Sequence, residues 1–257
     1  MKILMVGDVI GRPGRKAVHT VVPGLRHQYG IDLVIANGEN AAGGVGLTQA
    51  TAEELFQSGV DVLTSGNHIW QQKEIIPHLD GELPIVRPLN YPQGVPGHGY
   101  LMVGPTLVVN LVGRTFMGNF DCPFRAIDHL LEELTPRPTA IVVDFHAEAT
   151  SEKVALGWYL DGRVSAMLGT HTHVGTIDAR LLPKGTAFVS DVGMAGPIDS
   201  VIGADTEAVL STFLTLMPAR LSVGKGNLIF NSVLVEIEET SGRATSITRI
   251  DQELKVP

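Results

Sequence analysis

Cysteine is nearly absent from this chain of 257 residues, which contains a single one, Cys122. One thiol forms no disulfide within the chain, and it cannot build a zinc site from thiolates. This usage fits a reduced, cytoplasmic setting. Because a free cysteine usually packs as a small apolar residue, we expect Cys122 to be buried or partly buried and to take no part in chemistry.

Long apolar runs and a surplus of positive charge are also absent. No segment approaches about 18 uninterrupted apolar residues, so no transmembrane helix is expected, and the apolar stretch after Met1 is too short for a signal peptide. The net charge of −8 argues against a protein that coats nucleic acid or an anionic membrane. A small nucleotide substrate remains compatible with this charge, because bound metal ions supply their own positive charge.

Alternating strand-like and helix-like segments fill the first half of the chain. This βαβ alternation predicts a largely parallel sheet, and no composition shift divides the chain, so we expect one domain over residues 1–257. The expected strands are 3–7, 32–36, 60–64, 140–144, 165–168 and 186–189, with hairpins at 99–103/107–112 and 231–238/244–250. The expected helices are 14–29, 48–58, 70–79, 124–134 and 205–217. The proline-rich segment 82–105 is expected to be irregular, with an exposed edge that could support a homo-oligomer.

Five short polar clusters stand where apolar, strand-like runs end. Open α/β sheets bind ligands outside the carboxyl ends of their strands, so we expect these clusters to meet at one edge of a sheet. Their oxygen and imidazole groups suit two divalent metal ions. The clusters are Gly7-Asp8, Gly38-Glu39-Asn40, Gly66-Asn67-His68, Phe145-His146 and Gly169-Thr170-His171-Thr172-His173.

Single members of these clusters also have simpler explanations. Asp8 could cap a turn, Asn40 could be a left-handed turn residue beside glycines, and His68 could be an ordinary surface histidine. His171 and His173 are more specific, because in an extended segment alternate side chains point to the same side. Taken together, the clusters favour a dinuclear site, in which a carboxylate such as Glu39 could bridge two ions.

The clusters resemble the five-block signature of the calcineurin-like metallophosphoesterases, with two departures. Ile10 stands where that family has a histidine, and Glu39 replaces the bridging aspartate beside Asn40. Both departures match the bacterial YmdB-like phosphodiesterases, which the chain resembles over essentially its whole length. The motifs that carry the resemblance are Gly-Asp-Val-Ile-Gly-Arg-Pro-Gly at 7–14, Asn-Gly-Glu-Asn-Ala-Ala-Gly-Gly at 37–44 and Gly-Asn-His at 66–68.

This resemblance implies an α/β fold, the four-layer αββα metallophosphoesterase sandwich, with two metal ions, iron or manganese. It implies that one metal is held by Asp8, Asn40 and His173, and the other by Asn67, His146 and His171. Glu39 would bridge the two metals, and Asn40 would replace the missing histidine ligand.

The activity that the resemblance implies is hydrolysis of 2′,3′-cyclic nucleotides at the 2′ bond. A hydroxide bridging the metals would attack phosphorus, and His68 would protonate the leaving oxygen without being a ligand. Two alternatives stay open: a phosphomonoesterase or protein phosphatase on the same centre, and a regulatory protein that keeps the metals but binds RNA or a partner.

Three further side chains could assist such a site. Arg12 and Arg114 are candidate phosphate contacts, although solvated surface roles explain them equally well. Glu148 could orient a ligand histidine through a hydrogen bond, or be an ordinary surface glutamate.

Overall fold

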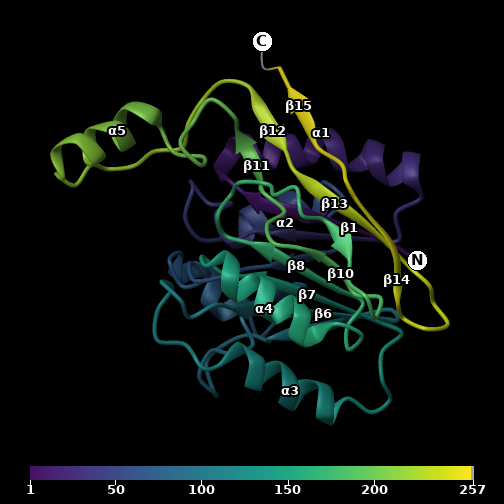
Figure 1. Cartoon of the computed structure of the whole chain (residues 1–257). Helices are drawn as coiled ribbons and strands as arrows, with labels where there is room; N and C mark the ends of the chain where they lie inside the picture. The colour runs from purple at the N-terminus through teal and green to yellow at the C-terminus, as the bar shows by residue number, and fades with distance from the viewer. Residues whose placement is uncertain (256–257) are drawn as a thin grey trace.

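Two β-sheets packed face to face form the centre of the molecule, and helices cover the outer face of each (Figure 1). The computed structural model describes residues 1–255. The four-layer αββα sandwich expected from the sequence is confirmed. The helices are α1 (Gly11–Tyr29), α2 (Gln49–Gln57), α3 (Pro123–Glu133), α4 (Thr150–Leu160) and α5 (Thr206–Thr215), with a 3-10 helix at Lys73–His78.

The first sheet has nine strands and contains the amino-terminal strand. Its order is β15-β12-β11-β1-β2-β3-β4, and β13 pairs with both β1 and β14. Strands β1 to β4 run parallel to one another, whereas β13 runs antiparallel to β1. The bounds are β1 (Lys2–Val9), β2 (Leu33–Asn37), β3 (Val62–Thr64), β4 (Ile85–Val86), β11 (Met194–Pro197), β12 (Leu228–Phe230), β13 (Ser232–Ile237), β14 (Ala244–Arg249) and β15 (Gln252–Leu254).

The second sheet has six strands in the order β5-β6-β7-β8-β10-β9. Strands β6, β7, β8 and β10 are parallel, so β7 and β8 end at the same edge of this sheet. The bounds are β5 (Tyr100–Val103), β6 (Thr106–Val112), β7 (Ala140–His146), β8 (Ala166–Thr170), β9 (Arg180–Leu181) and β10 (Ala187–Val189).

The side chains of β1 point alternately into two different cores, which shows why the sequence forms layers. Leu4 and Val6 belong to an apolar core shared with α1 and α2, whereas Ile3 and Met5 belong to the core between the two sheets. Successive side chains of a strand point to opposite faces, so a strand buried on both faces is apolar throughout. A third core joins the second sheet to α3 and α4, which completes four layers.

Most of the expected elements are present, with some corrections. The side chain of Thr48 caps α2 by accepting the Thr51 N–H, as the sequence indicated, and both expected hairpins form. Helix α1 begins at Gly11 instead of residue 14, and the helix expected at 70–79 is the shorter 3-10 helix. Helix α4 and strands β9, β11, β12 and β15 were not anticipated.

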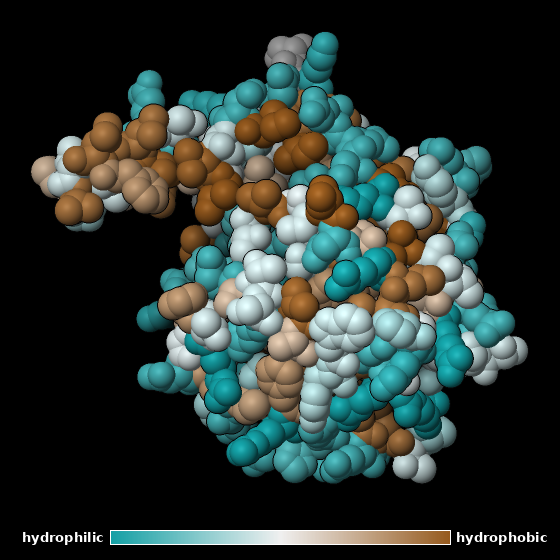
Figure 2. All heavy atoms as spheres, in the orientation of Figure 1, coloured by the Kyte–Doolittle hydropathy of each residue, from teal (hydrophilic) through white to brown (hydrophobic). Residues whose placement is uncertain are grey.

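One helix, α5, projects from the body of the molecule on an arm (Figure 1). The arm is largely apolar on its surface (Figure 2), and Phe213, Leu214 and Leu216 are strongly exposed there. Across residues 1–255, no helix has the length and apolar character needed to cross a membrane.

Candidate metal centre

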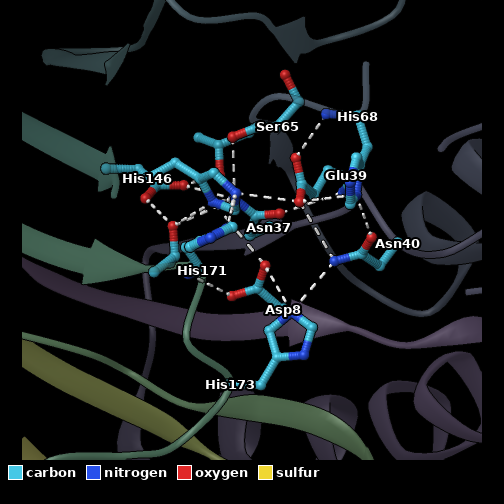
Figure 3. Close-up of polar contacts among 12 residues, drawn as sticks. Asp8, Asn37, Glu39, Asn40, Ser65, His68, His146, His171 and His173 are labelled. Carbon is cyan, nitrogen blue, oxygen red and sulfur yellow. Dashed lines mark hydrogen bonds and ion pairs between the residues drawn. The ribbon is translucent and has the colours of Figure 1, made fainter. Parts of the chain in front are cut away.

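The polar clusters meet where strands of both sheets end (Figure 3). Asp8 lies in β1, Glu39 and Asn40 follow β2, His68 follows β3, His146 ends β7, and His171 and His173 follow β8. Nε2 of His146 lies 3.0 Å from Oε1 of Glu39 and 3.0 Å from Nδ1 of His171. Nε2 of His173 lies 3.6 Å from Oδ1 of Asp8 and 3.3 Å from Nδ2 of Asn40.

Two fully buried carboxylates form the centre of this cluster. Burial alone would raise the pKa of Glu39, but His146 and His68 outweigh it and hold the pKa well below its usual value. Burial likewise acts to raise the pKa of Asp8, and His173 and His146 lower it. Both side chains are therefore anionic at neutral pH, and such charges are buried only where cationic partners or metals accompany them.

The hydrogen bonds behind His146 determine which ring nitrogen faces the centre. The hydroxyl of Thr170 donates to Asp144 at 2.7 Å, so its single proton is committed. The hydroxyl oxygen of Thr170 lies 2.9 Å from Nδ1 of His146, and it can therefore only accept from Nδ1–H. Nε2 of His146 is left facing Glu39 and His171, and it is the nitrogen that would bind a metal in place of its proton.

The other two histidines are oriented in the same way. Nε2 of His171 lies 3.0 Å from the carboxylate of Glu148, and Nδ1 of His173 donates to the carbonyl of Ile202 at 2.8 Å. In each ring the other nitrogen turns inward. Burial and the neighbouring His146 lower the pKa of His171 to about 4. Burial also acts to lower the pKa of His173, but the negative charge of Asp8 outweighs it and raises that pKa to about 9.

The backbone of the His-x-His segment differs from the extended conformation expected. Strand β8 ends at Thr170, and His171 and His173 have φ values of 101° and 63°, in the left-handed region. The two rings therefore converge through a strained loop and not through strand alternation, and each serves a different part of the cluster. A buried residue holds this loop: Asp191 accepts from the N–H and the hydroxyl of Thr172, at 3.0 and 2.7 Å.

Asp191 is in turn paired with a buried lysine. Nζ of Lys153, on α4, donates to Oδ2 of Asp191 at 2.7 Å, and both side chains are only 2% exposed. The other oxygen of Asp191 accepts from the N–H of Gly193 at 2.8 Å. The pair therefore connects the His-x-His loop to a helix on the outer face of the second sheet.

Two carbonyl or carboxylate oxygens of the predicted ligands have no hydrogen-bond donor among residues 1–255. Oδ1 of Asp8 and Oδ1 of Asn67 are buried without a hydrogen-bond partner. The facing nitrogens of His146 and His171 are only 3.0 Å apart, so a proton or a metal cation must lie between or beside them. Within residues 1–255, Glu39, His146 and His171 form a group whose ligand atoms lie within 4.8 Å of one another. This donor set fits metal cations.

The remaining candidates lie outside the buried cluster. Glu148 contacts His171, which favours its orienting role over that of an ordinary surface residue. Arg12 and Arg114 have exposed side chains that form no ion pair among residues 1–255. Gly66 packs so closely on the centre that a methyl group there would overlap the ring of His146 and the carboxylate of Glu39.

Several supporting residues were missed at the sequence level. Asp144 accepts from Thr64, Thr170 and Asn37, and burial raises its pKa to about 6. Asp144 could have been noticed as a charge inside the apolar run 140–146, where an acid has no packing role. Asp191 gave no such signal.

Comparison with known proteins identifies the family of this chain. The family model described as "YmdB-like protein" matches residues 4–250. A 2′,3′-cyclic-nucleotide 2′-phosphodiesterase of Bacillus subtilis (strain 168) is 49% identical over 254 residues, covering 97% of this chain and 96% of that protein. A crystal structure of a hypothetical protein from Thermus thermophilus superposes with a TM-score of 0.93 at 47% identity, covering 99% and 100% of the two chains.

A second solved structure, from Mycoplasma pneumoniae and described as a novel phosphatase, has the same fold. Its TM-score is 0.93 at 33% identity, over 100% of this chain and 95% of that one. The family match and the identity to these relatives extend over nearly the whole chain. The chain belongs to the YmdB-like family.

Proposed function

We propose that this chain is a dinuclear metal-dependent phosphodiesterase that hydrolyses 2′,3′-cyclic nucleotides at the 2′ bond. The observation that carries the proposal is the convergence of His146, His171 and His173 on two buried carboxylates, Asp8 and Glu39. The activity named for the Bacillus subtilis relative, at 49% identity, supports the choice of substrate.

The seven candidate ligands divide into two groups around Glu39. His173 Nε2 lies beside Asp8 and Asn40, which supports one cation held by these three residues. His146 and His171 face each other on the other side, and they would hold the second cation together with Asn67. Imidazole, amide and carboxylate ligands suit iron or manganese. When bound, the cations would stabilise charge on the phosphoryl oxygens and activate water.

The side-chain amide of Asn40 connects the cations to the proton donor. Its Nδ2 faces Glu39 and His173, and its Oδ1 lies 3.0 Å from Nδ1 of His68. In this orientation Oδ1 can accept from Nδ1–H of a doubly protonated His68, whose Nε2–H would then be the proton available for transfer.

His68 is placed for proton transfer to the leaving group. Its side chain is 32% exposed, whereas those of Glu39 and His146 are buried, so the imidazole lies between the cluster and solvent. As water attacks phosphorus, the bond from phosphorus to the 2′ oxygen breaks and that oxygen takes a proton. The imidazolium form of a histidine can supply it and become neutral, and such general acids contribute roughly 10²- to 10⁴-fold to rate.

A phosphomonoesterase is the second candidate function. The description of the Mycoplasma pneumoniae structure as a phosphatase favours it, and the same acceptor cluster would serve both ester types. The two functions differ in whether a diester is cleaved and in which bond is broken.

The test compares substrates on protein stripped of metal and reloaded with Mn²⁺ or Fe²⁺. We expect turnover of adenosine 2′,3′-cyclic phosphate to adenosine 3′-phosphate, and much slower release from p-nitrophenyl phosphate. If the reloaded protein cleaves only the monoester, the phosphatase function is correct. If it leaves every cyclic phosphodiester intact, the proposed function is wrong.

A pair of histidine variants tests the acid. We expect His68→Asn to keep its metal content and to lose about 10²- to 10⁴-fold in kcat. His27→Asn is the matched control, since His27 is exposed on α1, outside the cluster. Undiminished kcat in His68→Asn would contradict the assigned role.

A further inference from the structure

A cavity of about 940 Å³ lies between the loop that follows β4 and helix α3. Its lining includes two aromatic rings, Tyr91 and Phe120, two exposed arginines, Arg114 and Arg125, and the single cysteine, Cys122. No residue proposed as a metal ligand lines it. The proposed hydrolysis therefore gives this cavity no role.

One wall of the cavity contacts the backbone beside the candidate metal centre. The hydroxyl of Tyr91 donates to the carbonyl of Gly66 at 3.4 Å, and Gly66 packs directly against His146 and Glu39. Burial and the charge of Glu39 raise the pKa of Tyr91 to about 12, so this hydroxyl remains a neutral donor. The cavity therefore begins at the edge of the centre and extends away from it.

The wall that contains Arg114 starts from the strand end beside His146. Strand β6 pairs with β7 in a register that places Val112 beside His146, and Arg114 follows two residues later. Arg114 and Arg125 form no ion pair among residues 1–255, in a chain whose net charge is −8. Asp121 and Glu133 also line the cavity. Unpaired guanidinium groups in an acidic protein favour a phosphate ligand.

The aromatic rings are held in place by one another. Tyr91 forms edge-to-face pairs with Phe120 at 5.2 Å and with Trp70 at 5.6 Å between ring centroids. Arg87 stiffens the adjoining loop by donating to its backbone carbonyls, among them that of Pro96 at 3.1 Å. Fixed aromatic side chains beside cationic ones are the usual surface for stacking bases of single-stranded nucleic acid.

We propose that this cavity binds the nucleotide on the 5′ side of a 2′,3′-cyclic phosphate, so that the preferred substrates are oligoribonucleotide ends. The inference rests on the proposed function, because the cyclic phosphate must lie at the metal centre. From there an RNA chain continues only through its 5′ oxygen. The volume of the cavity, about 940 Å³, is near the upper end of the roughly 300–1,000 Å³ range of small-molecule pockets. It offers more space than a mononucleotide at the centre would fill.

The kinetic test compares two substrates of the same chemistry. We expect kcat/KM for the diadenosine ApA ending in a 2′,3′-cyclic phosphate to exceed that for adenosine 2′,3′-cyclic phosphate about tenfold. Arg125→Gln should lower the dinucleotide value about fivefold to tenfold, as loss of a charged hydrogen bond does, and leave the mononucleotide value within twofold. Arg243→Gln is the control, since it removes the same charge near Thr139 and Ser165, where β7 and β8 begin.

Cys122 provides a readout that does not depend on catalysis. As the chain's only cysteine, and a lining residue of the cavity, it can be alkylated alone. We expect ApA ending in a 3′-phosphate to slow alkylation of Cys122 severalfold in the wild-type protein, and less in Arg125→Gln. Adenosine 3′-phosphate at the same concentration should not slow it.

The outcomes separate this inference from the proposed function. Equal kcat/KM for the two cyclic substrates, with no effect of Arg125→Gln, would overturn the cavity assignment and leave the phosphodiesterase intact. Protection of Cys122 by ApA without turnover of any cyclic phosphate would contradict the proposed function while supporting a nucleotide site in the cavity. Absence of protection at dinucleotide concentrations that saturate turnover would also overturn the assignment.

Discussion

Replacing Lys153 by methionine should destabilise the protein and loosen the loop that carries two of the proposed ligands. Methionine keeps an unbranched apolar stem of similar length but removes the ammonium group that lies 2.7 Å from Asp191. The carboxylate of Asp191 would then be buried without its cation. It would retain the N–H and hydroxyl of Thr172 and the N–H of Gly193.

The contacts that Asp191 would keep determine the expected loss of stability. Breaking a buried ion pair by removing one partner costs about 3–5 kcal/mol, and the three remaining donors favour the lower end, about 3 kcal/mol. For a chain of this size such a loss lowers Tm by roughly 6–12 °C. Because Thr172 lies between His171 and His173, we also expect weaker metal binding.

The assay is thermal unfolding of stripped and reloaded protein, with metal affinity measured by titration. Lys2→Met is the matched control, since Lys2 pairs with Glu236 at 3.5 Å on the surface and should cost less than about 1 kcal/mol. A double variant that adds Asp191→Asn should recover part of the loss, because it removes the unpaired charge. If Lys153→Met unfolds within about 2 °C of the wild-type protein, the pair does not stabilise the loop as argued.

Three further predictions concern the groups around the histidines. Glu148→Gln should weaken metal binding about 10- to 100-fold, as loss of a carboxylate behind a ligand histidine does, and a titration with Mn²⁺ would measure it. Gly66→Ala should prevent metal loading, because the methyl group would overlap His146; full loading would refute this. Asp144 has its pKa raised to about 6, so the stripped protein should lose stability on the order of 1–3 kcal/mol as pH rises from 4 to 6. In Asp144→Asn this part of the pH slope should be absent from thermal unfolding curves.

The ligand positions were largely predictable because they depend on local sequence. Buried strands are apolar on both faces, so a polar residue at a strand end is conspicuous, and parallel strands necessarily end at a common edge. Asp8, Glu39 and His146 are of this kind, and the structure brings all three together.

The residues that support the cluster depend on tertiary contacts that the sequence does not display. Helix α4 was missed because its pattern is only weakly amphipathic and Gly157 interrupts it; Gly157 packs against Phe188, where a larger residue would not fit. Strand β11 contains Gly196 and Pro197, which normally argue against a strand. The left-handed backbone at His171 is imposed by contacts with distant residues and contradicts local preference.

The division of the cluster between the two sheets has a consequence for folding. The oxygen groups come from residues 8 to 67, at the end of the first sheet, and the imidazoles from residues 146 to 173, at the end of the second. Cations held by both groups would act as cross-links that close loops of roughly a hundred residues, which is where a covalent bridge constrains an unfolded chain most. In a protein with one cysteine, metal binding would thus cross-link distant parts of the chain, as disulfides do in other proteins.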